Sequence, residues 1–234
     1  MHLALKSIGI GPGDEVIVPT MTFASTADVV TYCGAKPILV DVEYDSLNIS
    51  LQHIKEKINK KTKAIIPVHY GGQSCDMDKI LAISKKSQLK IIEDCAHALG
   101  STFKQKKCGN IGDVGCFSFY PTKIITTGEG GMVVTNSQKI NKKIIQLRSH
   151  GMSYLPQDRE KSAIWNYDIV DLGYNYRLDE IRAALGISQF QRIKKINDLR
   201  IKIAKKYDSD LQKIKGIIIP KKMENRNHIY HLYT

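Results

Sequence analysis

CFSFYPTKIITTGEGGMVVT, residues 116–135, is the most informative stretch of this sequence. Cys116–Phe119 is predicted to be a buried strand, Lys123 follows it in a turn, and Met132–Val134 is the next strand. Residues 126–131 are rich in Gly and Thr, and glycine permits positive φ and close approach of the backbone to a ligand. The stretch therefore indicates a sheet that carries a lysine and a glycine-rich loop at the end of one strand.

Similar apolar runs recur along the chain and alternate with segments of helical periodicity. Further strands are predicted at Val16–Val18, Ile38–Val40, Ala64–Val68 and Lys90–Ile92. Helices are predicted at Ala24–Tyr32, Leu51–Asn59, Met77–Lys86 and Gln138–Arg148. Because continuous apolar strands are typical of sheets covered on both faces, the alternation predicts a three-layer α/β domain with a mostly parallel central sheet flanked by helices.

The C-terminal part of the chain has a different pattern. Asp179–Leu211 is strongly helical and is predicted to form two helices. Met152–Asp168 has no periodicity and is predicted to be a loop, while His228–Thr234 resembles the start of a strand. The inward apolar stripe of the helical stretch is predicted at Ile181, Ala184, Leu185, Ile193 and Ile196.

Composition limits the class of protein. The chain has 234 residues, of which 42% are hydrophobic and 25% charged, which is a globular profile and excludes collagen-like, disordered and disulfide-stapled chains. The formal net charge of +12 is compatible with a polyanion or with an anionic small substrate. The lysines are scattered and have no interleaved aromatic residues, so solvated surface positions are the favoured interpretation and no nucleic-acid partner is expected.

Cysteine content and hydropathy bear on location. Five cysteines without a C-x-x-C spacing favour buried reduced thiols, and neither a disulfide framework nor a metal site is predicted. The sequence has no apolar run of about 18 residues, and its first residues lack the features of a signal peptide. A cytoplasmic protein with no membrane partner is therefore expected.

Three side chains next to predicted strands suit one another chemically. A lysine held in a strand-end turn, such as Lys123, can lose its proton and condense with an aldehyde. Asp94 follows a strand at the carboxyl edge, where it can pair with a protonated pyridine nitrogen and keep the ring an electron sink, as pyridoxal phosphate chemistry requires. Phe23 can stack on a flat ring. Taken singly, each residue has an ordinary alternative, namely a surface lysine, a helix N-cap and a core aromatic side chain.

Ser118 and His97 are secondary candidates at the same edge. The Ser118 hydroxyl lies shortly before Lys123 in the sequence and can bind a phosphate. His97 follows Asp94 closely enough to reach the same pocket, although a single histidine is more often structural.

Together these segments resemble the nucleotide-sugar aminotransferases of the DegT/DnrJ/StrS type, which are pyridoxal-phosphate enzymes of fold type I. The resemblance implies that the predicted α/β domain is the large domain of that fold, with pyridoxal 5'-phosphate as its cofactor. The matching motifs follow the family's order and are GIGPGDEVIVPTMTFAST, VHYGGQSCDMD, IIEDCAHALGS, GDVGCFSFYPTKIITTGEGGMVVT and LGYNYRLDEIRAALG.

The resemblance also implies a role for each matching residue. Lys123 is similar to the lysine that forms the internal aldimine and then moves protons, and Asp94 to the partner of the pyridine nitrogen. Phe23 matches the aromatic residue on the ring face, and Ser118 the phosphate-binding serine. Asn175, in GYNYR, matches an asparagine that reaches the phosphate from the other subunit of a dimer.

Two further residues, Gln73 and His97, resemble pocket residues of the family. The reaction implied is transfer of an amino group from glutamate to a nucleotide-linked keto-sugar, in a homodimer with shared active sites. Some relatives have histidine in place of the lysine and dehydrate sugars, so Lys123 favours transamination. A sugar dehydratase, a cyclitol aminotransferase and a non-catalytic regulator with the same fold remain alternatives.

The sequence departs from the family pattern at both ends. No Ser-Gly-Thr phosphate-binding segment precedes the helix expected at His2, and the family continues well beyond His231 into a small C-terminal domain. The chain is therefore expected to be truncated at both ends. Residues 1–200 would form the cofactor-binding large domain with an incomplete N-terminal edge, and residues 201–234 the start of the small domain.

Overall fold

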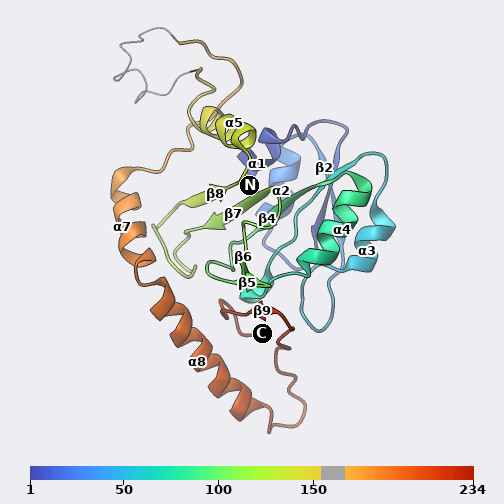
Figure 1. Cartoon of the computed structure of the whole chain (residues 1–234), viewed down its shortest axis with the longest axis vertical. Helices are drawn as coiled ribbons and strands as arrows, with labels where there is room; N and C mark the ends of the chain where they lie inside the picture. Colours follow the sequence, from blue (N-terminus) through green and yellow to red (C-terminus); the bar gives the residue numbers. More distant parts are fainter. Residues whose placement is uncertain (154–166) are drawn as a thin grey trace.

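A six-stranded sheet runs through the centre of the computed structural model, which describes residues 1–153 and 167–234 (Figure 1). Its strand order is β2-β1-β3-β4-β7-β8, with all neighbouring pairs parallel except β7 and β8, which are antiparallel. The predicted mostly parallel sheet is thus confirmed. The strands are β1 Glu15–Pro19, β2 Lys36–Val40, β3 Thr62–Ile65, β4 Lys90–Asp94, β7 Val114–Ser118 and β8 Gly131–Val134.

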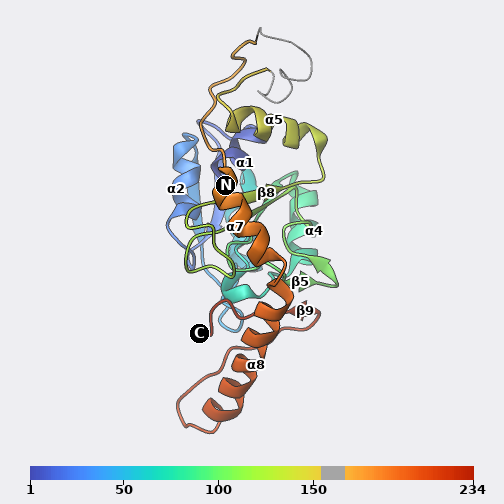
Figure 2. The ribbon, with the colours of Figure 1, turned by 90° about the vertical axis from the view of Figure 1, so that its left-hand side faces the viewer.

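Helices cover both faces of this sheet, as the continuous apolar strands predict. Successive strand residues point to opposite faces, so Val16 and Val18 pack in one apolar cluster while Ile17 packs in another. The first cluster includes residues of α1 His2–Ser7, α2 Ser25–Tyr32 and α5 Gln138–Arg148; the second includes α3 Leu51–Lys57 and α4 Met77–Ser87. Figure 2 shows α2 and α4 on opposite sides of the strands, so the three-layer arrangement is confirmed.

Capping residues set where several helices begin. Asp76 accepts a hydrogen bond from the Lys79 amide at the start of α4, and Ser137 accepts one from the Ile140 amide at the start of α5. Each cap satisfies one backbone N–H that has no partner within the helix. This explains why the predicted and observed starts of α4 and α5 coincide.

The C-terminal segment forms less strand than the sequence suggests. A small sheet of order β6-β5-β9 joins β5 Thr102–Phe103, β6 Lys106–Lys107 and β9 Arg226–Asn227. Residues 228–234, expected to begin a strand, form no strand, and this prediction was wrong. Tyr230 has a φ of 50°, a left-handed conformation that interrupts extended backbone. The segment is held instead by hydrogen bonds from the amides of Ile229 and Leu232 to the carbonyls of Gly72 and Gly71.

Two helices, α7 Glu180–Phe190 and α8 Ile193–Leu211, form from the long helical stretch as predicted. The predicted inward stripe is wrong for α7: the side chain of Ile181 is 85% exposed, and Ala184 and Leu185 are also exposed. Ile193 and Ile196 of α8 do pack inward. The reason is that α7 meets the body of the protein through a different face, the one that carries Gly186 and Gln189.

Helix α8 continues without a break through residues 200 and 201, and the division into two domains at that point stays a prediction. The predicted loop at Met152–Asp168 lies mostly outside the described residues. All five cysteines are buried and free. Within residues 1–153 and 167–234, no helix combines the length and the apolar character that crossing a bilayer requires.

Candidate functional site

Asp94 ends the central strand β4 and is buried at the carboxyl edge of the sheet. Its Oδ2 accepts a hydrogen bond from Thr26 Oγ1 at 3.0 Å, and its Oδ1 accepts one from the Ala96 amide at 3.0 Å. Crossovers in a parallel sheet return every strand in the same direction, so neighbouring strand ends converge at this edge. Asp94 lies inside β4 and caps no helix, so the alternative role as a helix N-cap is excluded.

Lys123 lies in the turn that follows β7, the strand beside β4. Its amide donates to the Tyr120 carbonyl at 2.9 Å, and the next two residues, Ile124 and Ile125, are buried in an apolar cluster. Burial lowers the pKa of the half-buried Lys123 amine, and the carboxylate of Asp94 acts in the opposite direction. The two groups therefore lie near enough to interact, and a larger fraction of Lys123 is neutral than of a surface lysine.

Phe23 stands on the same edge, between β1 and α2, with its side chain 76% exposed. The exposure excludes a core role. Its carbonyl accepts a hydrogen bond from the amide of Thr26, the residue whose hydroxyl binds Asp94. The free aromatic ring and the buried carboxylate are thus linked through one short segment.

Ser118 is the last residue of β7 and is partly buried. Its Oγ is 3.4 Å from the Tyr120 amide that donates to it. Among the described residues no side chain or carbonyl accepts the Ser118 hydroxyl proton, so this hydroxyl can donate to an added anion.

Two histidines face each other beside Lys123, and one of them was not recognised from the sequence. The rings of His97 and His231 lie 4.4 Å apart between centroids. The pKa of His97 is lowered to about 3, mainly by burial and to a smaller extent by the nearby His231 and Lys123. The pKa of His231 is lowered to about 4, mainly by burial and to a smaller extent by the positive charges of Lys123 and Arg200. Both rings are therefore neutral at pH 7.

Both histidines also carry an unpartnered polar atom. The Nδ1 atoms of His97 and His231 are buried and make no hydrogen bond within the described chain. Nη1 of Arg200 donates to the carbonyls of Tyr230 and His231 at 3.3 and 3.2 Å, which fixes the segment that carries His231. The spacing H-x-x-H at 228–231 was the available sequence signal, but it was interpreted as the start of a strand.

We expect these depressed histidine pKa values to make the fold less stable in acid. The unfolded chain binds a proton at each histidine below about pH 6.5, whereas the folded His97 and His231 stay neutral until the pH approaches about 3 and 4. The free energy of unfolding is therefore unaffected by these two histidines above pH 6.5, and it decreases as the pH falls from there toward their folded pKa values. Urea unfolding at several pH values measures the effect. His231→Gln, which cannot titrate, should reduce the loss between pH 6.5 and 4, and a pH dependence equal to that of the parent would contradict the prediction.

The side chains of Gln73 and Asn175 contact neither Lys123 nor Asp94 through any hydrogen bond within the described residues. The Gln73 Nε2 donates to the Lys221 carbonyl at 3.0 Å and its Oε1 accepts from the Met223 amide at 2.7 Å, so this amide is committed to the C-terminal segment. Asn175 is exposed and forms an isolated bridge with Ser149, next to the end of α5. An exposed Asn175 is free to contact another molecule.

A buried Glu93–His69 pair lies behind Asp94 and was also missed. Glu93 accepts from His69 Nε2 at 2.9 Å and from the amides of Gly109, Ile111 and Gly112. Burial alone raises the pKa of Glu93, but the His69 and backbone hydrogen bonds outweigh it and lower the pKa. With Cys95, the pair places three possible metal-ligand atoms within 4.8 Å. Both Glu93 oxygens are already saturated by hydrogen bonds, which fits a structural anchor for the turn at 109–112.

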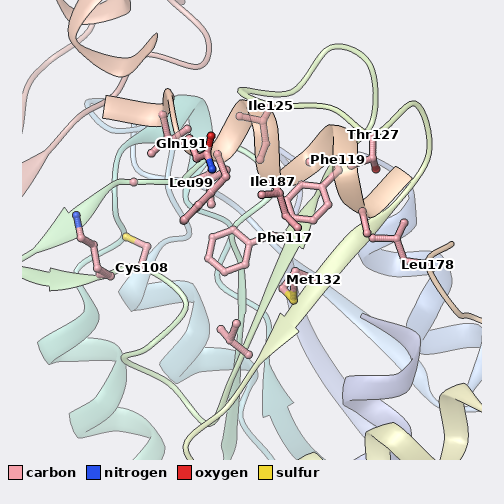
Figure 3. A pocket seen from close by; sticks show the side chains of 17 residues that line it. Leu99, Cys108, Phe117, Phe119, Ile125, Thr127, Met132, Leu178, Ile187 and Gln191 are labelled. Carbon is pink, nitrogen blue, oxygen red and sulfur yellow. The ribbon is translucent and has the colours of Figure 1, made fainter. Parts of the chain in front are cut away.

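A separate apolar cavity of about 700 Å³ lies between α7 and strands β7 and β8 (Figure 3). Phe117, Phe119, Met132 and Ile187 are among its lining residues. Neither Lys123 nor Asp94 lines it, and the surface of its walls is almost entirely apolar. The polar group of residues at the sheet edge, not this cavity, is the candidate functional site.

Comparisons with known proteins show which family the chain resembles. The chain is 43% identical over its whole length to the spore coat polysaccharide biosynthesis protein SpsC of Bacillus subtilis, and 41% identical to a GDP-perosamine synthase of Caulobacter vibrioides. It covers 60% and 61% of these proteins. The PLP form of the putative sugar aminotransferase Spr1654 from Streptococcus pneumoniae superposes with a TM-score of 0.88 at 33% identity, over 99% of this chain and 62% of that one. The family model for DegT/DnrJ/EryC1/StrS aminotransferases matches residues 1–234, and the chain belongs to this family.

Proposed function

We propose that this chain carries the pyridoxal-phosphate site of an aminotransferase that moves an amino group from glutamate to a nucleotide-linked keto-sugar. The observation that carries the proposal is the pair formed by a half-buried Lys123 with a lowered pKa and a buried Asp94 at the ends of adjacent strands. Membership of the aminotransferase family and the GDP-perosamine synthase relatives support the reaction and the substrate class.

The residues present fit the cofactor. Pyridoxal phosphate has an aldehyde, a pyridine nitrogen, a flat ring and a phosphate, and each has a chemical counterpart here. Lys123 offers an amine, Asp94 a buried carboxylate, Phe23 an exposed ring and Ser118 a hydroxyl free to donate. Buried, unpartnered Nδ1 atoms on His97 and His231 mark the same region as one built for a polar ligand.

When bound, pyridoxal phosphate supplies an aldehyde for the amino donor and a ring that accepts electron density from the carbon that loses its proton. Asp94 would hold the pyridine nitrogen in its protonated form, since a carboxylate favours a cation beside it. The Thr26 and Ala96 hydrogen bonds fix the orientation of this carboxylate.

Lys123 would act as the base and acid of the reaction. Burial lowers the pKa of its amine, so the neutral form is available to take a proton from the donor and return it. Neutral His97 and His231 border this amine without adding positive charge. They can hydrogen bond to a hydroxyl or carboxylate oxygen of a substrate.

The shared active site of a homodimer belongs to the same proposal. Asn175 is exposed, and in a dimer it would reach the phosphate bound by the partner subunit. The excess of positive charge would favour binding of the substrate's diphosphate. A cytoplasmic location and the two-domain division at residues 200 and 201 complete the proposed description.

Amine transfer with isotopically labelled glutamate tests the proposal. The chain is incubated with pyridoxal phosphate, labelled glutamate and a panel of nucleotide-linked keto-sugars and keto-cyclitols, and products are analysed by mass spectrometry. Label in a nucleotide-sugar is expected. Label found only in a cyclitol would favour a cyclitol aminotransferase. A dehydrated sugar without label would favour a dehydratase. Cofactor binding without any product would favour a non-catalytic regulator.

A further inference from the structure

A side chain of α7 is hydrogen bonded to the backbone of the loop that carries Lys123. The Gln189 Oε1 accepts from the Thr126 amide at 3.2 Å, and its Nε2 donates to the Thr126 carbonyl at 2.6 Å. One planar amide thus satisfies both backbone groups of a single residue. Two hydrogen bonds to one residue fix both its position and its orientation.

Thr126 lies close to Lys123 in sequence and is tied to the same turn. Thr126 Oγ1 donates to the Phe119 carbonyl at 3.0 Å and accepts from the Gly128 amide at 2.9 Å. The Thr127 amide donates to the same Phe119 carbonyl at 2.9 Å. Residues 119–127 therefore form a closed loop with Thr126 at its base and Lys123 at its turn.

Helix α7 approaches this loop closely because glycine stands at position 186. A Cβ added there would lie 3.0 Å from Thr127 Cγ2, closer than ordinary contact. Figure 3 shows Thr127 and Ile125 beside the helix that carries Ile187. Helix α7 has no buried residue, and its contacts with this loop include the two hydrogen bonds of Gln189 and the close approach at Gly186.

The other side of the loop is held by apolar packing. Ile124 and Ile125 are buried with Phe119 and Ile229, and Ile193 packs against this cluster. Apolar contacts are non-directional and allow small shifts, whereas the paired hydrogen bonds of Gln189 specify one geometry.

We propose that Gln189 is a positioning residue for Lys123: it fixes the Thr126 backbone and so holds the lysine amine in its partly buried place. The expected effect of Gln189 on turnover rests on the proposed function. Its effect on the position of Lys123 does not, because that can be measured in the chain without cofactor. Small displacements of a reacting group can reduce rates about 10²-fold, which is why such a residue matters.

The test compares Gln189→Met, which keeps the length and helical preference of the side chain but removes both hydrogen bonds, with Gln191→Met. Gln191 is exposed near the end of the same helix and makes no side-chain hydrogen bond in the described chain. The pKa of Lys123 is measured without cofactor by competitive amine labelling and mass spectrometry over a range of pH. Amide hydrogen exchange of residues 121–127 is measured in parallel.

In Gln189→Met, we expect the Lys123 labelling profile to move to higher pH, because a loosened turn exposes the amine, and exchange at residues 121–127 to speed up at least about tenfold. Turnover with glutamate should fall about 10–100-fold while Gln191→Met resembles the parent in all three measurements. An unchanged Lys123 profile and unchanged exchange in folded Gln189→Met would overturn the inference. A shifted profile in a chain that never transfers an amine would instead refute the proposed function and leave the coupling intact.

Discussion

Lys123→Ala is expected to abolish the visible absorption band of bound pyridoxal phosphate and to reduce amine transfer by at least about 10⁴-fold. The methyl group of alanine cannot condense with an aldehyde or carry a proton, and positioned acid–base groups contribute up to about 10⁴-fold on their own. The fold should survive, because Lys123 is only partly buried and the buried residues of its turn are Ile124 and Ile125. The measurements are an absorbance spectrum after addition of cofactor and a labelled-glutamate assay.

Lys139→Ala is the matched control for this variant. Lys139 is exposed on α5, so the same substitution there should leave both the absorption band and the turnover unchanged. Lys123→Arg adds a second control, since it keeps a positive charge but has no readily deprotonated amine. If Lys123→Ala retained the band and the turnover, the assignment of the lysine would be wrong.

Asp94→Asn is expected to reduce amine transfer by about 10²–10³-fold with little loss of fold stability. Asparagine has the same shape, its Oδ1 can still accept from the Ala96 amide, and its NH₂ group can donate to Thr26 Oγ1. The negative charge that would hold the pyridine nitrogen protonated is lost. Steady-state kinetics with glutamate should therefore show a fall in kcat, and urea unfolding a free energy within about 1 kcal/mol of the parent.

Asp198→Asn provides the control for this substitution. Asp198 is exposed on α8, where it pairs with Lys194 at 2.9 Å, and an exposed pair of this kind contributes little to stability. Its turnover should equal that of the parent. Parent-like kcat in Asp94→Asn would show that the carboxylate has no part in the reaction.

Local patterns predicted most of the sheet and its flanking helices. The continuous apolar stretch Val16–Val18 lies within β1, because a strand buried on both faces needs apolar residues at successive positions. Helix α5 was predicted with the bounds that the structure shows, from its helical periodicity. Lys123, Asp94, Phe23 and Ser118 could be named as candidates because each lies beside a recognisable strand.

Helix orientation could not be predicted in the same way. Ile181 and Leu185 have the right spacing for an inward face, yet they are exposed because α7 is docked through Gly186 and Gln189. Periodicity identifies a helix with an apolar stripe, but the partner surface decides which face is buried.

What the amino-acid order fixed about this protein is therefore local: the strands, the helices and the strand ends at which reactive side chains stand, since these follow from residue periodicity and short-range hydrogen bonding. The chain's three-dimensional packing decided the long-range juxtapositions. It brought His231 against His97 from the far end of the chain, committed Gln73 to residues 221–223, and placed Gln189 on the backbone of Thr126. Contacts between residues so far apart depend on how whole layers pack together, and no short stretch of sequence carries that information.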